Sequence, residues 1–150
     1  MAHLTFSGSF DHSLDSKGRV IIPASFRDAL GENFTITINP NKTAVAIYPK
    51  EVWDGQLERL SHINPMDKVG MRYERYLMSV SFSGNSMDAQ GRVLIPAKLR
   101  AKIGLTRDIV FVGLNHFIEI WDADVYAQME AQTEEEFDDL ADYVYEKYPT

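Results

Sequence analysis

The sequence predicts an α+β fold in which two tandem repeats close one β-barrel about a pseudo-twofold axis. First, a stretch of nineteen residues occurs twice, starting at Ser13 and at Ser86, and ten of its positions are identical. Second, both copies continue into the same order of strand and helix signals, at a constant offset of 73 positions. Third, a unit of about 45 residues buries too little apolar surface to fold alone, so two copies must share a core.

Each copy predicts a turn between two short strands, then a short helix, then two further strands. An aspartate opens the turn and a glycine supplies a positive φ: Asp15 and Gly18 in the first copy, Asp88 and Gly91 in the second. A proline is predicted as the first helical residue and a glycine ends the helix. These are Pro23 and Gly31, then Pro96 and Gly104. The predicted helices are ASFRDAL and AKLRAKI, and the strands after them are FTITI, AVAIY, DIVFVG and HFIEIW.

Helical apolar spacing recurs between the copies and after the second one. Two helices are expected over residues 50–60 and 66–80, broken at Asn64 and Pro65, and an acidic helix over residues 122–148. The acidic helix carries a stripe suited to a neighbouring element, formed by Phe137, Leu140, Tyr143 and Val144. The predicted division is 7–54 for the first repeat, 55–82 for a helical linker, 83–126 for the second repeat and 127–150 for the C-terminal helix.

The charge of the chain is unevenly distributed. The net charge is −7, but residues 1–110 hold 14 Lys/Arg against 11 Asp/Glu, whereas residues 111–150 hold 1 against 11. A polyanion responds to the local field rather than to the net charge, so the first three-quarters of the chain are compatible with DNA. No apolar run reaches the roughly 18 residues of a membrane span, and cysteine is absent. We therefore expect a cytoplasmic protein with no membrane partner.

The sequence offers no recognisable catalytic, metal or cofactor site. The histidines are scattered without metal-ligand spacing. The run DHSLDSKG has its glycine at the eighth place, where a calcium loop needs one at the sixth. Neither a GxSxG nor a phosphate-binding glycine loop occurs. We therefore expect no enzyme, no metal and no cofactor.

The basic residues at the two turns are the candidate functional residues. Lys17 and Arg19 flank Gly18, and Arg92 follows Gly91. Cations on exposed turns hold phosphates, and the arginine fork reads guanine in the major groove. The predicted DNA-binding residues are Lys17, Arg19, Arg27, Gln90, Arg92 and Arg100. Two alternatives remain: these are solvated charges, or the arginines pair with the turn aspartates and lock the turns. The duplication of Gly-Arg in the same turn favours function.

The pattern D-x-x-G-R-[VIL]-x-I-P, present twice, resembles the MraZ family of bacterial transcriptional regulators. The resemblance spans nearly the whole chain and implies the swapped-hairpin fold of the AbrB/SpoVT group. It further implies binding to short direct repeats of double-stranded DNA in the promoter of the family's own division and cell-wall gene cluster, usually as a repressor. A nucleoid-associated, ring-shaped homo-oligomer is expected, with the D-x-x-x-R turns facing DNA. The motif residues are Asp15 and Arg19 in the first copy, and Asp88 and Arg92 in the second.

Two other functions remain open from the sequence. One is an antitoxin-like interaction module of the same fold, whose tail captures a protein; the duplication disfavours it, because such antitoxins carry one copy. The other is an enzyme or small-ligand binder that uses the Asp/Arg turns, which nothing in the sequence requires. The two copies also differ at one relevant place, Lys17 against Gln90. The first turn therefore either grips phosphate more strongly or meets a different part of the DNA site.

Overall fold

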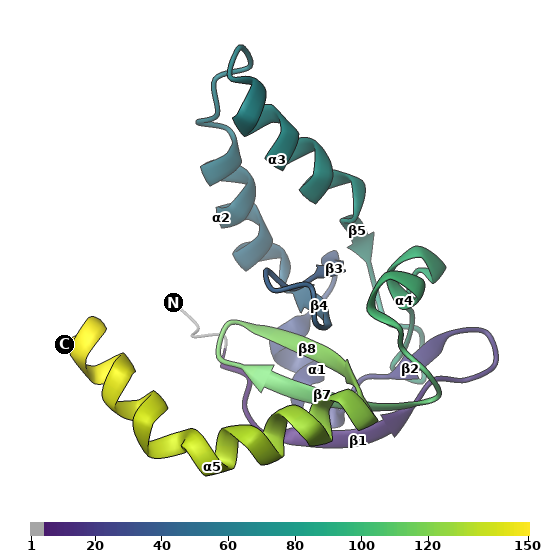
Figure 1. The fold of residues 1–150 in the computed structure, drawn as a ribbon. Coiled ribbons are helices and arrows are strands. Elements are labelled where there is room, and N and C mark those ends of the chain that lie inside the picture. The colour runs from purple at the N-terminus through teal and green to yellow at the C-terminus, as the bar shows by residue number, and fades with distance from the viewer. Residues whose placement is uncertain (1–4) are drawn as a thin grey trace.

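A computed structural model describes residues 5–150 of the chain and shows a mixed α+β fold (Figure 1). The first repeat contributes β1 (Ser9–Ser13), β2 (Arg19–Ile21), α1 (Ala24–Leu30), β3 (Phe34–Ile38) and β4 (Val45–Tyr48). The linker contributes α2 (Lys50–Leu60) and α3 (Lys68–Ser79). The second repeat contributes β5 (Phe82–Asn85), β6 (Arg92–Leu94), α4 (Ala97–Ile103), β7 (Asp108–Leu114) and β8 (Phe117–Asp122), and α5 (Ala123–Lys147) follows. The helices predicted from spacing are therefore confirmed.

The two repeats exchange strands. The larger sheet has the order β1-β7-β8-β4-β3-β5, so the first strand of each repeat pairs with the third strand of the other. A second sheet consists of β2 and β6 alone, again one strand from each repeat, and all pairs are antiparallel. The strands before and after each turn thus pair with the other repeat rather than with each other as a hairpin. Since β1 and β5 stand at opposite ends of the strand order, closure into a barrel stays a prediction, as do the boundaries 7–54 and 83–126.

One core is built from matching positions of both repeats. Residues related by the 73-position offset are buried together, for example Ile22 with Ile95 and Ile36 with Ile109, each at most 1% exposed. Phe26 of α1 packs edge-on against Phe6 and Phe10. Because the apolar surface of both repeats is removed from water in one cluster, neither repeat is expected to fold without the other.

The prolines before α1 and α4 differ from the sequence prediction by one position. Pro23 and Pro96 have ψ values of 136° and precede the first helical residues, Ala24 and Ala97. The carbonyl of Pro23 accepts the first bond of its helix from Phe26 N, at 2.9 Å. Each proline is therefore the N-cap, since its extended ψ brings the chain out of the preceding strand and into the helix.

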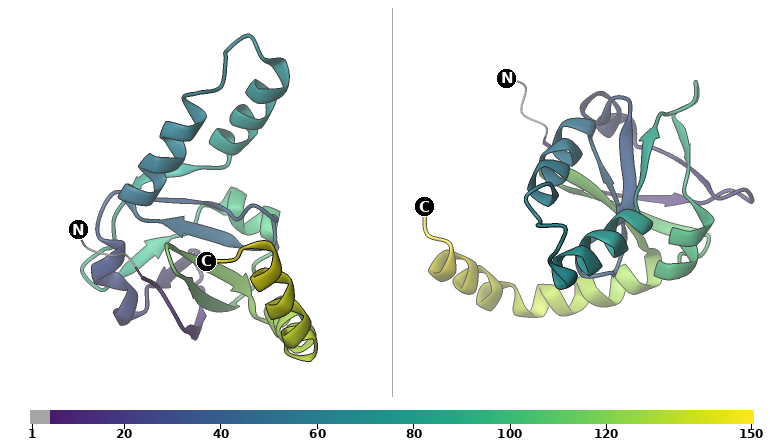
Figure 2. Two further views of the ribbon diagram at one scale, coloured as in Figure 1. Left: turned by 90° about the vertical axis from the view of Figure 1, so that its left-hand side faces the viewer. Right: turned by 90° about the horizontal axis from the view of Figure 1, so that it is seen from above.

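α2 and α5 begin against the β core, where Trp53 contacts Tyr48 and Tyr126 contacts Trp121, and the α2–α3 hairpin and the far half of α5 extend beyond it (Figure 2). α2 and α3 form a hairpin, and Asp67 caps α3 by accepting bonds from Val69 N and Gly70 N. Asp122 caps α5 and also accepts bonds from Thr106 N and Oγ1, which ties the start of α5 to the segment before β7. No residue of α5 is buried. Within residues 5–150, no helix is long and apolar enough to cross a membrane.

Candidate nucleic-acid interface

The first turn joins β1 to β2 and is organised by one aspartate. Asp15 Oδ1 accepts bonds from Lys17 N and Arg19 N, at 2.9 and 2.8 Å, while its Oδ2 accepts from Arg19 Nε at 2.7 Å. Gly18 N donates to the Asp15 carbonyl at 3.0 Å. The Arg19 backbone N–H, above all, and then its side chain lower the pKa of Asp15 to about 2. The carboxylate is therefore charged at neutral pH and holds the arginine over the ribbon.

The second turn repeats this geometry. Asp88 Oδ1 accepts from Gln90 N and Arg92 N, and its Oδ2 accepts from Arg92 Nε at 2.8 Å. The backbone N–H of Arg92 is again the main cause of a lowered pKa for Asp88. The terminal Nη2 of Arg92 lies 3.4 Å from Gln90 Oε1. Gln90 thus accepts a long hydrogen bond from the arginine of its own turn. Lys17 cannot do the same for Arg19, because a lysine side chain has no acceptor.

Each turn glycine is covered by an arginine from the other repeat. Gly18 has φ +84° and Gly91 has φ +79°, the conformation that favours glycine. A Cβ added at Gly18 would lie 2.6 Å from Arg100 Nε, and one added at Gly91 would lie 2.7 Å from Arg27 Nε. Both arginines also donate from Nε to a backbone carbonyl of their own repeat, Ile95 and Ile22 respectively. α4 therefore braces the first turn and α1 braces the second.

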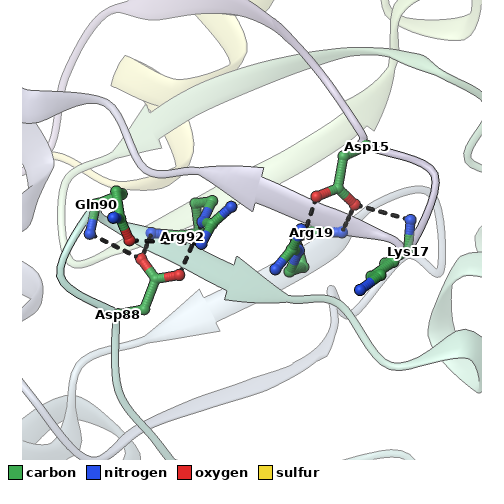
Figure 3. A network of polar contacts seen from close by, with 6 residues as sticks. All are labelled: Asp15, Lys17, Arg19, Asp88, Gln90 and Arg92. Carbon is green, nitrogen blue, oxygen red and sulfur yellow. Dashed lines mark hydrogen bonds and ion pairs between the residues drawn. The ribbon is translucent and has the colours of Figure 1, made fainter.

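The β2–β6 ribbon joins the two turns into one surface (Figure 3). Arg19 lies opposite Leu94, and Ile21 lies opposite Arg92. The strands alternate, so the middle residue Val20 is buried while its neighbours face outward. The ribbon is extended at both ends by bonds from Ile22 N to Gly91 O and from Ile95 N to Gly18 O. The outward face thus carries two arginines and two apolar side chains, flanked by the two turns.

The structure brings most of the predicted residues together and separates two of them. Arg19 and Arg92 lie on the outward face, with about a third of each side chain exposed. Lys17 and Gln90 are exposed on the turns. Arg27 and Arg100 are half-buried behind the turns, where they contact backbone and glycine. DNA contact by these residues stays a prediction, and for Arg27 and Arg100 the geometry adds a bracing role.

Two outward-facing residues were missed by the sequence reasoning. Ile21 and Leu94 are 45% and 55% exposed at the centre of the ribbon. The signal was present in the alternation: Val20 and Ile22 are buried, so the residue between them must face the other way. Large exposed apolar residues between two arginines mark a contact surface.

The arrangement suits binding rather than catalysis. Each arginine commits its Nε to an aspartate, which leaves the two terminal amino groups of the guanidinium as the outer edge. A planar pair of donors on a rigid mount matches a phosphate or a guanine edge. Among residues 5–150, no three His, Cys, Asp or Glu side chains gather into a set that could hold a metal ion.

A family model and the sequences of individual relatives match the chain to proteins of the same name. A family model described as "MraZ protein, putative antitoxin-like" matches residues 5–75 and 84–144. A protein of Lachnoclostridium phytofermentans named transcriptional regulator MraZ is 38% identical over 94% of this chain and 96% of its own. Proteins of the same name from Pediococcus pentosaceus and Lactiplantibacillus plantarum are 38% and 39% identical over 91% of this chain, covering 94% and 96% of their own lengths.

Proposed function

The chain belongs to the MraZ family of transcriptional regulators, and we propose that it regulates transcription by laying the β2–β6 ribbon and its two turns against DNA. The observation that carries this proposal is the outward face of the ribbon. It presents two arginine forks, each held by an aspartate of its own turn, around an exposed apolar centre. A family of regulators and a rigid cationic surface of this kind point to the same partner.

The ribbon fits the major groove of B-DNA. That groove is about 12 Å wide and admits a two-stranded β-ribbon. Arg19 and Arg92 would donate to guanine O6 and N7 or to phosphates, and Ile21 and Leu94 would contact thymine methyl groups. The turn aspartates limit the freedom of the arginines, so less side-chain entropy is lost on binding. The proposed DNA-binding residues remain Lys17, Arg19, Arg27, Gln90, Arg92 and Arg100.

The target is proposed to be short direct repeats in the promoter of the chain's own division and cell-wall gene cluster, with repression as the outcome. This follows the expectation set by the family resemblance. A protein bound at its own promoter hinders polymerase, so occupancy lowers transcription. The same reasoning places the protein in the cytoplasm, associated with the nucleoid.

We further propose that several copies assemble into a ring. α3 exposes Val69 and Tyr73, which are 77% and 63% exposed, alongside Lys68, Arg72 and Arg75. α5 exposes the apolar stripe Phe137, Leu140, Tyr143 and Val144 on a strongly acidic helix. Opposite charges around two apolar faces favour docking of α5 from one copy on α3 of the next. Such a contact joins different surfaces, and contacts of this kind form a ring when the rotation from one copy to the next closes.

The test is DNA binding by the wild type and by the Arg19→Ala/Arg92→Ala variant. The probe is the region upstream of the chain's own gene, with scrambled DNA of equal length for comparison and salt varied. A control variant, Lys50→Ala/Arg59→Ala, removes two exposed charges from α2, outside the ribbon and the proposed contact between copies. We expect probe-specific binding that the ribbon variant loses and the control retains, with circular dichroism and light scattering unchanged.

Two outcomes would contradict the proposal. If the ribbon variant binds as well as the wild type, the ribbon is not the DNA-binding surface. If the wild type does not distinguish the probe from scrambled DNA, the regulator function fails at this promoter. A protein that then co-purifies with the chain and is released by deleting α5 would favour the antitoxin-like alternative. A monomer in light scattering would contradict the ring.

A further inference from the structure

A hollow lies beside the first turn, and most of its lining residues differ from those at the matching positions of the second turn. Resting on the proposed function, we propose that this hollow holds a backbone phosphate of the bound DNA, with Arg107 as its principal ligand. Its volume is about 470 Å³. The lining residues are Leu14, Asp15, Ser16, Arg100, Leu105, Thr106 and Arg107. It is therefore built by the first turn together with the α4–β7 segment of the other repeat.

The backbone positions Arg107 next to the turn. Its carbonyl accepts a bond from Leu14 N at 2.8 Å, at the residue just before the turn aspartate. The adjacent Thr106 is held by two bonds to Asp122, so the wall of the hollow is fixed. The Arg107 side chain itself is exposed. A fixed backbone with an exposed guanidinium suits a bidentate phosphate contact.

The charges around the hollow favour an anion. Asp15 is the carboxylate in its lining, and that group already accepts from Arg19 Nε at 2.7 Å. Asp122, behind the wall, is bonded to Thr106 and to the start of α5. Asp108, the residue after Arg107, lines a separate hollow with Asp11. Among residues 5–150, no carboxylate forms an ion pair with Arg107 or the half-buried Arg100, the two cations of the lining.

The second turn has the matching aspartate and bracing arginine but lacks the other side chains of this site. The 73-position offset puts Phe34 where the first site has Arg107, and Phe34 is fully buried at the start of β3. The Phe34 carbonyl accepts a hydrogen bond from Asn85 Nδ2 at 3.1 Å. The same offset puts Glu32 in place of Leu105 and Asp28 in place of Ala101, both exposed. A phosphate that approaches the second turn in the same way would meet two carboxylates.

The asymmetry gives each subunit a direction on DNA. The first turn anchors the ribbon to the backbone, whereas the second contributes an arginine without a neighbouring phosphate site. A pseudo-twofold ribbon with two equal anchors would bind equally in both orientations. With one anchor it binds in one orientation, which suits repeats that all point the same way.

The experiment measures the salt dependence of DNA binding by Arg107→Ala, with Arg59→Ala as the control that removes one exposed arginine from α2. Each phosphate contact contributes about −0.9 to the slope of log affinity against log salt. We expect Arg107→Ala to make the slope shallower by about 0.9, so the variant loses about threefold less affinity than the wild type between 50 and 200 mM salt. The effect should be equal on promoter and scrambled DNA, since a phosphate carries no sequence information. Arg107→Lys keeps the charge and should keep the slope.

The proposal is overturned if Arg107→Ala and Arg59→Ala give the same slope as the wild type. That result leaves the proposed function standing, provided that Arg19→Ala/Arg92→Ala still abolishes specific binding. It is equally overturned if the loss is confined to the promoter probe, because the residue then reads sequence. A wild type that binds no DNA overturns both proposals together. Because the Arg107 side chain is exposed, the variant is expected to fold, and its circular dichroism checks this.

Discussion

The two turns have nearly the same internal geometry and quite different neighbours. In each, the arginine donates Nε to the aspartate four residues earlier, at 2.7 Å in the first turn and 2.8 Å in the second. Each glycine is covered by an arginine of the opposite repeat. The first turn, however, lies beside α4 and Arg107, whereas the second lies beside α1, with Asp28 and Glu32 close in sequence to the arginine that braces it.

This difference follows from the exchange of strands between the repeats. Contacts within five consecutive residues are copied whenever the sequence is copied. Because the strands are exchanged, each turn also contacts the other repeat. Differences between the repeats therefore change the surroundings of a turn but leave its internal geometry unchanged. A duplicated chain can thus keep the same aspartate–arginine geometry in both turns and still place different charges around each turn.

The largest effect is expected at the turn glycines, and it should be equal on both sides. Gly18→Ala or Gly91→Ala places a Cβ at a positive φ and against the bracing arginine. Strain and the lost arginine contact together cost roughly 3–5 kcal/mol of unfolding free energy. Urea unfolding measures this, and Gly104→Ala is the control, since it has a similar φ and open space around it. Unequal losses at the two turns, or a loss no greater than in the control, would contradict the common geometry.

A smaller loss is expected when the bracing arginines are removed. Arg27→Ala and Arg100→Ala each lose a charged hydrogen bond to a backbone carbonyl, at roughly 1.5–3 kcal/mol. Because the braces cross between repeats, Arg27→Ala should speed amide exchange at Gly91 and leave Gly18 protected. Arg100→Ala should do the reverse. Exchange that increases in the turn of the mutated repeat itself would show that the braces do not cross.

Exchanging Lys17 and Gln90 tests the charge asymmetry directly. The variant Lys17→Gln/Gln90→Lys keeps the net charge but moves the lysine from the side of Arg107 to the side of Asp28 and Glu32. We expect binding several-fold weaker than in the wild type, with a salt slope shallower by up to about 0.9. Fluorescence anisotropy with the promoter probe measures both. Unchanged affinity would mean that the two sides are electrostatically equivalent.

The smallest effect concerns pH. The pKa of Asp15 lies at about 2, below its ordinary value of 3.8, and that of Asp88 is also lowered. Stabilisation of the turns by these carboxylates is therefore fully present above pH 3.8 and is lost as the pH falls towards 2. DNA affinity should accordingly show no dependence on these groups near neutral pH. A side-chain NMR titration checks this, and a midpoint at or above 3.8 for Asp15 would contradict the bonds from Arg19 and Lys17.

The sequence predicts what is local and misses what depends on the exchange. The turns, the short helices and the strands β3, β4, β7 and β8 follow from neighbouring residues, and all of these elements are present. Their alternation is typical of half-buried strands, but every residue of β3 and β4 is buried, because α2 packs on their second face through Trp53. The shared core follows from the size of one repeat. The residue pattern did not predict the pairing of β2 with β6, because three residues carry too little pattern to choose a partner. Only the family resemblance implied that the repeats exchange strands.

In the candidate site, too, the sequence predicts residues that belong to a local motif and misses roles that depend on contacts between the repeats. Arg19 and Arg92 were identifiable from the repeated Gly-Arg pair. Arg27 and Arg100 were grouped with them because they are basic and nearby in sequence, yet they contact glycines 64 and 82 positions away along the chain. Arg107 has no counterpart in the first copy, so a search for repeated features passes over it. Only contacts between the repeats reveal these roles.

The central claim is that the outward face of the β2–β6 ribbon contacts DNA. The chain has no cysteine, so a single one introduced as Ile21→Cys or Leu94→Cys can carry a DNA-cleaving reagent at a known point. Ser61→Cys, at the end of α2, is the matched control. The account predicts cleavage within the promoter repeats from positions 21 and 94, and none from position 61. Cleavage from position 61 alone, or from none of the three while the proteins bind the probe, would contradict it.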